Sequence, residues 1–482
     1  MTAQRIGLFL GPLAFAISVF APAPAGMEPA AWLVAGLVVW MAAWWMTEAV
    51  PLPVTALLPF VCLPLSGVMT ARETASAYYA PILFLLLGGA FIALAIERTG
   101  LHRRLSLAIL KAIGSQGGQV RLLFAFMISA AILSGLISNT STTLIMMPMA
   151  LAVLAGGASL QMVEGEAPQT NGIYGALPMG IAFAATIGGL GTIVGSPTNG
   201  IAVQLLDDMI GLQISFAQWM TFGLPIVLIG VPLACVIIAR VQKVNAHTFD
   251  VAAARSAIDD HAAWTPAEKR LVPIIAITFA LWMTRRWVAP YLPEGSWTDG
   301  TIAVVAALTL FLLPDGSNDN GKTRALLKWH EADRAPWGVI LMFGGGLALA
   351  AGMQASGLAD WLGQSLLPLE TLPLFIVALA VVAMVVLVTE FASNVATASA
   401  IIPVVASLAA GLGLGEAAIL IAMPAALAAS WGFILPAGTG PNAIAWSTGR
   451  LRIEKLVRAG LVLDILGIFL IVALVWGVAF IF

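Results

Sequence analysis

Long apolar segments recur along this chain, each about as long as a lipid bilayer is thick, since a helix needs about 20 apolar residues to cross one. Of the 482 residues 60% are hydrophobic and 10% are charged, against about 25% charged in a typical soluble domain. Because a water-facing surface needs more charge, we predict an all-α polytopic membrane protein in contact with lipid. The net charge of −2 provides no basic stripe, so nucleic acid is not an expected partner.

Length and apolarity predict about 11 transmembrane helices. Most are continuous, but two contain Gly and Pro where the helix should break. The continuous segments lie near residues 7–24, 30–48, 52–68, 80–97, 218–239, 271–290, 298–314, 336–356 and 459–481, and the interrupted ones near 175–204 and 418–447.

The distribution of Lys and Arg predicts which side of the membrane each loop faces, because cytoplasmic loops carry an excess of both. This rule also places the N-terminus inside. Loops 98–121, 240–270, 322–334 and 450–458 are basic and predicted inside, whereas loops 205–217, 291–299, 357–370 and 411–417 carry acidic but no basic residues and are predicted outside.

Two apolar segments, 122–157 and 371–410, do not fit a single crossing. If either crossed once, the next basic loop would fall outside, against the charge rule. We therefore predict two re-entrant hairpins, one entering from each side. Non-helical backbone at that depth is tolerated only inside protein or along a watery cavity, so the hairpins indicate a substrate path.

The hairpins belong to an internal repeat whose two copies have opposite orientations. Paired broken helices in inverted repeats are typical of secondary transporters with a site near the bilayer midplane, although Gly and Pro also serve simple helix packing. The matched motifs are Ala80-Pro81 with Ala335-Pro336, Ser138-Asn139-Thr140 with Ser393-Asn394-Val395, Pro148 with Pro403, and Gly195-Ser196-Pro197-Thr198-Asn199 with Gly438-Thr439-Gly440-Pro441-Asn442.

The hairpin tips and helix breaks contain Ser, Thr and Asn but no Lys, Arg or His. Free N–H groups at helix starts suit an anion, and free carbonyls at helix ends suit a small hard cation such as sodium. A dianion without a cationic side chain would be poorly compensated at low dielectric, and bound sodium would supply the missing charge. Sodium-coupled uptake of a small dianion is therefore favoured over simple exchange. Ordinary helix capping is the alternative role of these side chains.

The repeat predicts a division of the chain into regions. Residues 1–79 and 218–334 are expected to form scaffold helices, the latter with a cytoplasmic loop at 241–270. Residues 80–217 and 335–450 are expected to form the repeat cores, each with a hairpin and a broken helix, and 451–482 the C-terminal helix.

These motifs, together with Trp45-Met46-Thr47-Glu48-Ala49-Val50-Pro51-Leu52-Pro53, resemble the divalent anion:sodium symporter family over nearly the whole chain. The resemblance implies a homodimer with a scaffold domain and a transport domain that moves like an elevator. It implies a first sodium site at Ser134, Ser138, Asn139 and Gly195, and a second at Thr389, Ala392, Asn394 and Gly438. It implies substrate binding by Ser138, Asn139, Thr140, Ser393, Asn394, Val395, Thr439 and Gly440.

Two positions depart from the family pattern. Val395 replaces the Thr of the symmetrical motif, and the second break reads Thr439-Gly440-Pro441 where Thr-Pro-Pro is common. A lost hydroxyl removes one hydrogen bond, worth roughly 0.5–1.5 kcal/mol, so these changes bear on which anion is preferred. Glu390, beside the second tip, is expected either to stabilise that tip or to bind a proton.

The function predicted from these features is sodium-coupled symport of small dicarboxylates such as succinate, malate or fumarate across the cytoplasmic membrane of a bacterium. A sodium-independent exchanger, a carrier of citrate, tartrate or sulfate, and an ion channel are the alternatives. An enzyme is not expected, because no Ser/His pair, Asp pair or His-rich cluster lies at a common depth.

Overall fold

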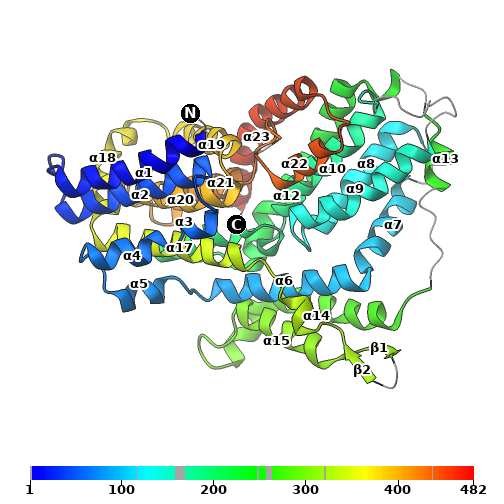
Figure 1. Cartoon of the computed structure of the whole chain (residues 1–482), viewed down its shortest axis with the longest axis horizontal. Helices are drawn as coiled ribbons and strands as arrows, with labels where there is room; N and C mark the ends of the chain where they lie inside the picture. Colours follow the sequence, from blue (N-terminus) through cyan, green and yellow to red (C-terminus); the bar gives the residue numbers. More distant parts are fainter. Residues whose placement is uncertain are drawn as a thin grey trace.

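The computed structural model describes residues 3–114, 117–157, 169–246, 249–256, 263–319, 322–436 and 438–481 (Figure 1). Ten helices in this part of the chain are long and apolar enough to cross a membrane. The protein is therefore an integral, multi-pass membrane protein, as predicted.

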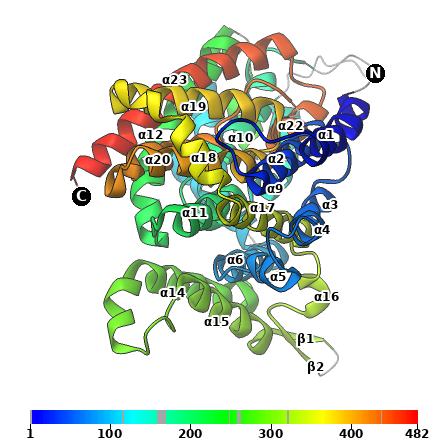
Figure 2. The same cartoon turned by 90° about the vertical axis from the view of Figure 1, so that its left-hand side faces the viewer.

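The N-terminal region forms five helices. α1 and α2 pack as an antiparallel pair, which Figures 1 and 2 show at the edge of the molecule. The bounds are α1 (Ala3–Phe20), α2 (Pro29–Thr47), α3 (Leu52–Thr55), α4 (Leu58–Leu65) and α5 (Ala71–Ala77).

The predicted repeat is present as two sets of helices in the same order: a long helix, an amphipathic helix, a hairpin and a broken helix. The first set is α6 (Ile82–Thr99), α7 (Leu101–Gly114), α8 (Gln119–Ser134), α9 (Asn139–Gly156), α10 (Ile173–Gly189) and α11 (Pro197–Ile210). The second is α17 (Trp337–Ala355), α18 (Leu358–Ser365), α19 (Leu374–Phe391), α20 (Asn394–Gly411), α21 (Ile419–Ala428) and α22 (Gly440–Ser447). Each long helix ends at a glycine with positive φ, Gly100 or Gly357, which allows the sharp turn that follows.

The remaining elements connect the two sets and close the chain. α14 and α15 form a separate layer with the strands β1 and β2, at the bottom of Figure 2. The bounds are α12 (Phe216–Gln242), α13 (Val251–Ser256), α14 (Pro266–Val288), α15 (Asp299–Leu312), β1 (Pro314–Asp319), β2 (Lys322–Ala325), α16 (Trp329–Ala332) and α23 (Ile453–Ile481).

Both hairpins turn for the same local reason. Ser138 and Ser393 are the N-caps of α9 and α20, and their hydroxyl oxygens accept hydrogen bonds from the N–H groups of Ser141 and Ala396, each at 3.2 Å. An N-cap satisfies one of the free donors at a helix start and fixes where the helix begins. The Ser-Asn pair that the two repeats share therefore fixes the position of each tip between the two helices of its hairpin.

Three segments differ from the sequence predictions. Segment 52–68 forms α3 and α4 instead of one continuous helix, because Pro59 cannot donate to the carbonyl four residues earlier and its ring clashes there. The predicted loop 98–121 contains α7, whose apolar residues pack on the first hairpin. A short antiparallel pair of strands, β1 and β2, was not expected in this helical protein; β2 lies in the predicted cytoplasmic loop 322–334, and β1 lies just ahead of it.

Different elements lie at the two ends of the molecule's long axis. In Figure 1, α7, α13 and the β1–β2 hairpin lie toward the right-hand end of the long axis, whereas α5 and α18 lie toward the left. Of these right-hand elements, α7, α13 and β2 lie in three of the four basic segments. The charge rule therefore predicts that this end faces the cytoplasm.

Candidate functional site

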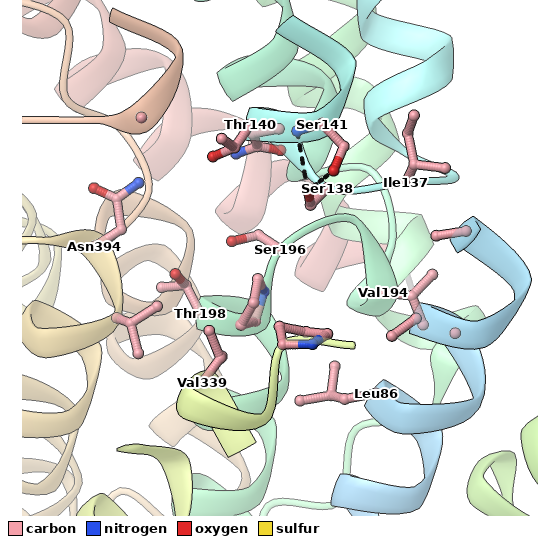
Figure 3. Close-up of a pocket in the computed structure, with 18 of the residues that line it drawn as sticks. Leu86, Ile137, Ser138, Thr140, Ser141, Val194, Ser196, Thr198, Val339 and Asn394 are labelled. Carbon is pink, nitrogen blue, oxygen red and sulfur yellow. Dashed lines mark hydrogen bonds between the residues drawn. The ribbon is translucent and has the colours of Figure 1, made fainter. Parts of the chain in front are cut away.

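A cavity of about 490 Å³ lies where the two repeats meet. This volume is within the range of small-molecule sites, roughly 300–1,000 Å³. Its walls include the first hairpin tip, both helix breaks, the second hairpin tip and one face of α6. Figure 3 shows Ser138 and Thr140 on one side of this space, Asn394 on another, and Ser196 and Thr198 between them.

The structure brings together all residues that the sequence assigned to the substrate. Ser138, Asn139, Thr140, Ser393, Asn394, Val395, Thr439 and Gly440 all line the cavity. Ser138, Asn139, Asn394 and Gly438, which the resemblance assigns to sodium, line it as well. Ser134, Gly195, Thr389 and Ala392 are buried behind the lining. The predicted cation ligands thus lie partly in the cavity wall and partly just beneath it.

Behind the first tip, the side-chain oxygen of Asn139 faces other oxygens. Asn139 Oδ1 lies 2.7 Å from Ser134 Oγ. The site that Oδ1 occupies is also 3.1 Å from the carbonyl oxygen of Gly195 and 3.2 Å from that of Ala185. Turning the amide over would let its nitrogen donate to all three. With the oxygen inward, four oxygens converge, a ligand set that suits a hard cation such as sodium.

The second tip repeats this arrangement. Thr389 Oγ1 lies 2.9 Å from Asn394 Oδ1 and 2.7 Å from the carbonyl oxygen of Ala429. Gly438 is close to the backbone oxygen of Glu390: an added Cβ would be 3.2 Å from it. Ala392 is the buried C-cap of α19, so only its backbone can contribute. The sequence did not identify Ala185 or Ala429, because any residue type supplies a carbonyl.

Side chains of the break motifs hold the unwound backbone in place. Asn199 Nδ2 donates to the carbonyl oxygens of Gly189 and Thr192, both at 2.8 Å, and Asn442 Nδ2 donates to that of Leu435 at 3.1 Å. Thr192 Oγ1 donates to the Gly135 carbonyl at 2.7 Å, which ties the first break to the first tip. The two break asparagines are therefore structural braces.

Glu390 also holds the unwound backbone of the second break in place. Its side chain is 3% exposed, and its carboxylate accepts hydrogen bonds from the N–H groups of Ile434, at 3.0 and 3.1 Å, and Leu435, at 3.0 Å. A carboxylate that receives several backbone donors is well stabilised even away from water. This geometry lets Glu390 stabilise the second tip and break, and the buried Asp464 of α23 lies beside it.

The two repeats touch across the cavity. A Cβ added at Gly440 would be 2.6 Å from Thr140 Oγ1, so the first hairpin tip packs directly on the second helix break. Gly440 is needed for this close approach. Thr198 also lines the cavity, and its Oγ1 is buried without a hydrogen-bond partner in the described chain. Thr198 and Ser196 are lining hydroxyl residues that the assignment of substrate residues omitted.

The cavity is nearly free of charge. Among the described residues that line it, the charged ones are Glu97, at the end of α6, and Arg334, ahead of α17. Arg334 Nη1 lies 3.7 Å from Glu97 Oε1. The tips and breaks themselves offer hydroxyls, amides and backbone N–H groups, as the sequence predicted. A doubly negative solute at the tips would need positive charge from another source.

The geometry can be compared with known proteins. Residues 3–482 match the family described as the sodium:sulfate symporter transmembrane region. The chain belongs to this family. This membership confirms the resemblance to the divalent anion:sodium symporters and makes the protein a member of a transporter family.

Among the relatives are two proteins called sodium-dependent dicarboxylate transporter SdcS. The one from Staphylococcus saprophyticus is 35% identical over 482 residues, which cover 98% of this chain and 91% of the relative. The one from Staphylococcus aureus (strain MRSA252) is 35% identical over 479 residues with the same coverage.

A solved structure, that of the Alcanivorax borkumensis YdaH transporter, is similar in fold. The TM-score is 0.59 at 14% identity, and the match covers 100% of this chain and 99% of that one. This likeness supports the polytopic helical architecture, and at such low identity it supports the fold alone.

Proposed function

We propose that this protein is a secondary transporter that moves small dicarboxylates together with sodium ions. The convergence of oxygens behind each hairpin tip carries the proposal: three surround the side-chain oxygen of Asn139, which makes four in all, and three converge at Thr389 and Asn394. Both clusters adjoin an uncharged part of the cavity. Relatives of matching length are called sodium-dependent dicarboxylate transporters, which supports the same substrate class.

The positions of the two cation sites explain how sodium binding would be coupled to anion binding. A sodium ion behind each tip would fix the asparagine with its oxygen inward and add positive potential to the cavity wall. The anion then binds more tightly, and by linkage the bound anion raises the affinity for sodium by the same factor. The N-termini of α9, α11, α20 and α22 are close to the cavity, and their free N–H groups suit the carboxylates.

The remaining assignments belong to the same proposal. The protein would lie in the cytoplasmic membrane of a bacterium with its N-terminus inside, act as a homodimer and carry no enzymatic activity. The two repeat cores would form the transport domain, which moves like an elevator past a scaffold that includes residues 1–79 and 218–334. The basic segments at one end of the molecule support this orientation.

The test is transport by purified protein in proteoliposomes. An inward sodium gradient should drive accumulation of labelled succinate or malate without any dicarboxylate inside. Uptake that is unchanged when choline replaces sodium would contradict the coupling. Uptake that requires unlabelled dicarboxylate inside would identify an exchanger, and competition by citrate, tartrate or sulfate would define the preferred anion. Flux that does not saturate with substrate would indicate a channel.

The site assignment is tested separately by two variants. Asn139→Ala and Asn394→Ala should each abolish sodium-driven uptake while the protein still reaches the membrane in normal amount, because each removes an oxygen from a cation cluster and a polar group from the cavity wall. Normal transport by both variants would contradict the assignment of this cavity.

A further inference from the structure

The two charged residues of the cavity come from the ends of its helical walls and not from the hairpin tips or helix breaks. Glu97 is close to the C-terminus of α6, and Arg334 lies just ahead of α17. Glu97 directly precedes the basic segment 98–121, and Arg334 is the last residue of the basic segment 322–334; both segments are predicted to face the cytoplasm. The pair therefore stands where a solute would pass between the tips and the cytoplasm.

The contact between the two side chains is loose. The closest nitrogen–oxygen distance is 3.7 Å, longer than a normal hydrogen bond. The side chain of Arg334 is 58% exposed and that of Glu97 is 38% exposed. An exposed ion pair of this kind contributes about 0–1 kcal/mol to stability, so either side chain can readily leave the other for a new partner. Little free energy is needed to separate Arg334 from Glu97.

Neighbouring cations are differently placed. Arg98 is 16% exposed and pairs with Asp315 and Glu331, and Arg324 pairs with the same two carboxylates. Their charges are compensated inside a fixed cluster. Among the described residues, Arg334 is the cation that both lines the cavity and has a partner it can readily release.

We propose that Arg334 recognises the anionic substrate at the cytoplasmic mouth of the cavity, where the substrate competes with Glu97 for it. This inference rests on the proposed transport of a dianion. A carboxylate arriving at the mouth forms a charge-assisted hydrogen bond with the guanidinium and displaces Glu97. Because low-dielectric walls focus the field of a charge in a cleft, Arg334 raises the local concentration of dianion on that side.

The proposal predicts an effect on one side of the membrane only. In inside-out vesicles, where the cytoplasmic face is exposed to the medium, Arg334→Gln should raise the KM for succinate about threefold, and Glu97→Gln should lower it by about twofold, because the competing carboxylate is gone. In right-side-out vesicles both variants should match the wild type. Arg334→Lys, which keeps the charge, should restore most of the wild-type KM.

Lys328→Gln is the matched control, since Lys328 is a cation of the same segment that does not line the cavity. Its KM should be unchanged on both sides. High concentrations of choline chloride should reduce the difference between wild type and Arg334→Gln, because the Debye length shortens from about 8 Å at 0.15 M salt to about 3 Å at 1 M.

The outcomes separate this inference from the proposed function. If wild-type vesicles show sodium-driven uptake but Arg334→Gln behaves like the wild type in inside-out vesicles, the role of Arg334 is wrong and the function stands. Equal changes on both sides, or the same direction of change in Arg334→Gln and Glu97→Gln, would show that the pair only holds α6 and α17 together. Absence of sodium-driven uptake in the wild type would overturn both.

Discussion

Asn139 and Asn394 occupy equivalent positions in the two repeats, and each directs its side-chain oxygen toward a hydroxyl oxygen five residues earlier, Ser134 or Thr389. The spacing from hydroxyl to amide spans the tip, so one helix end and the next helix start contribute to one cluster. In the proposed mechanism, this symmetrical pair of clusters would hold two cations that flank one anion.

Removal of a single hydroxyl should weaken one cation site. Ser134→Ala should raise the sodium concentration for half-maximal succinate uptake by about fivefold, because the lost oxygen contact is worth roughly 1 kcal/mol. Sodium titration of uptake in proteoliposomes measures this shift. Ser129→Ala is the control, since Ser129 is buried on the same helix and contacts Met146 instead of the tip. An equal shift in both variants would show a general effect on α8.

At the scale of helices, the site depends on the contact of each break with the other parts of the repeat. Thr192 joins the first break to the first tip, Glu390 joins the second tip to the second break, and Gly440 packs on Thr140 across the cavity. The two breaks are held by different chemistry, a hydroxyl in one and a carboxylate in the other. The repeats are thus symmetrical in helix order but not in their bracing.

The cross-repeat contact can be tested by adding one methyl group. Gly440→Ala should reduce the maximal uptake rate at least about tenfold, because its Cβ would lie 2.6 Å from Thr140 Oγ1 and force the tip and the break apart. Gly477→Ala, with open space around the new Cβ, should have no effect. Part of the lost rate should return in Gly440→Ala/Thr140→Ser, where the hydroxyl has more freedom to turn. Full activity of Gly440→Ala would exclude the close packing.

The break asparagines should matter for stability as well as for transport. Asn199→Ala removes a donor from the carbonyls of Gly189 and Thr192 in a fully buried place, and the Thr192 carbonyl keeps only the N–H group of Gly195. A buried group left unsatisfied costs about 1–3 kcal/mol. The melting temperature of the detergent-purified variant should fall by several degrees. Asn245→Ala, at an exposed position after α12, should melt close to the wild type. An unchanged melting temperature in Asn199→Ala would contradict its bracing role.

At the scale of the whole molecule, a charged cluster fastens the layer of α14, α15 and the β1–β2 hairpin to α6. Arg98 pairs with Asp315 and donates to the carbonyl oxygen of Leu326, and Asp315 is 3% exposed. Burial by itself raises the pKa of Asp315, but hydrogen bonds from Ser317 and the charge of Arg98 outweigh it and hold that pKa below its ordinary value. The ionised form therefore stabilises the fold.

This cluster predicts a pH dependence of stability. Because the pKa of Asp315 is lower in the folded than in the unfolded chain, its contribution is fully present above the unfolded value, about 3.9, and is lost as the pH falls through the folded value. Asp315→Asn should lower the melting temperature at pH 7, and the gap from the wild type should narrow below about pH 4. A gap that stays constant down to that pH would contradict the assignment.

The sequence alone determined the class of protein, the order of the repeats and the residues at both tips. The length and hydropathy of each segment indicate by themselves whether it can cross the membrane. Ser, Asn, Gly and Pro determine helix caps and breaks through local backbone chemistry, so these features can be predicted without knowledge of the fold. The break between α3 and α4 is not evident from hydropathy, because its prolines lie within one apolar run.

Only the tertiary structure decided which groups from distant segments meet. The carbonyls of Ala185 and Ala429, the reach of Glu390 to Ile434, and the pairing of Glu97 with Arg334 all join residues far apart in the chain. Such contacts depend on how helices pack, and backbone oxygens have no residue-specific signature. The local sequence supplies the ligands, whereas helix packing selects the few oxygens and charges that face the same space.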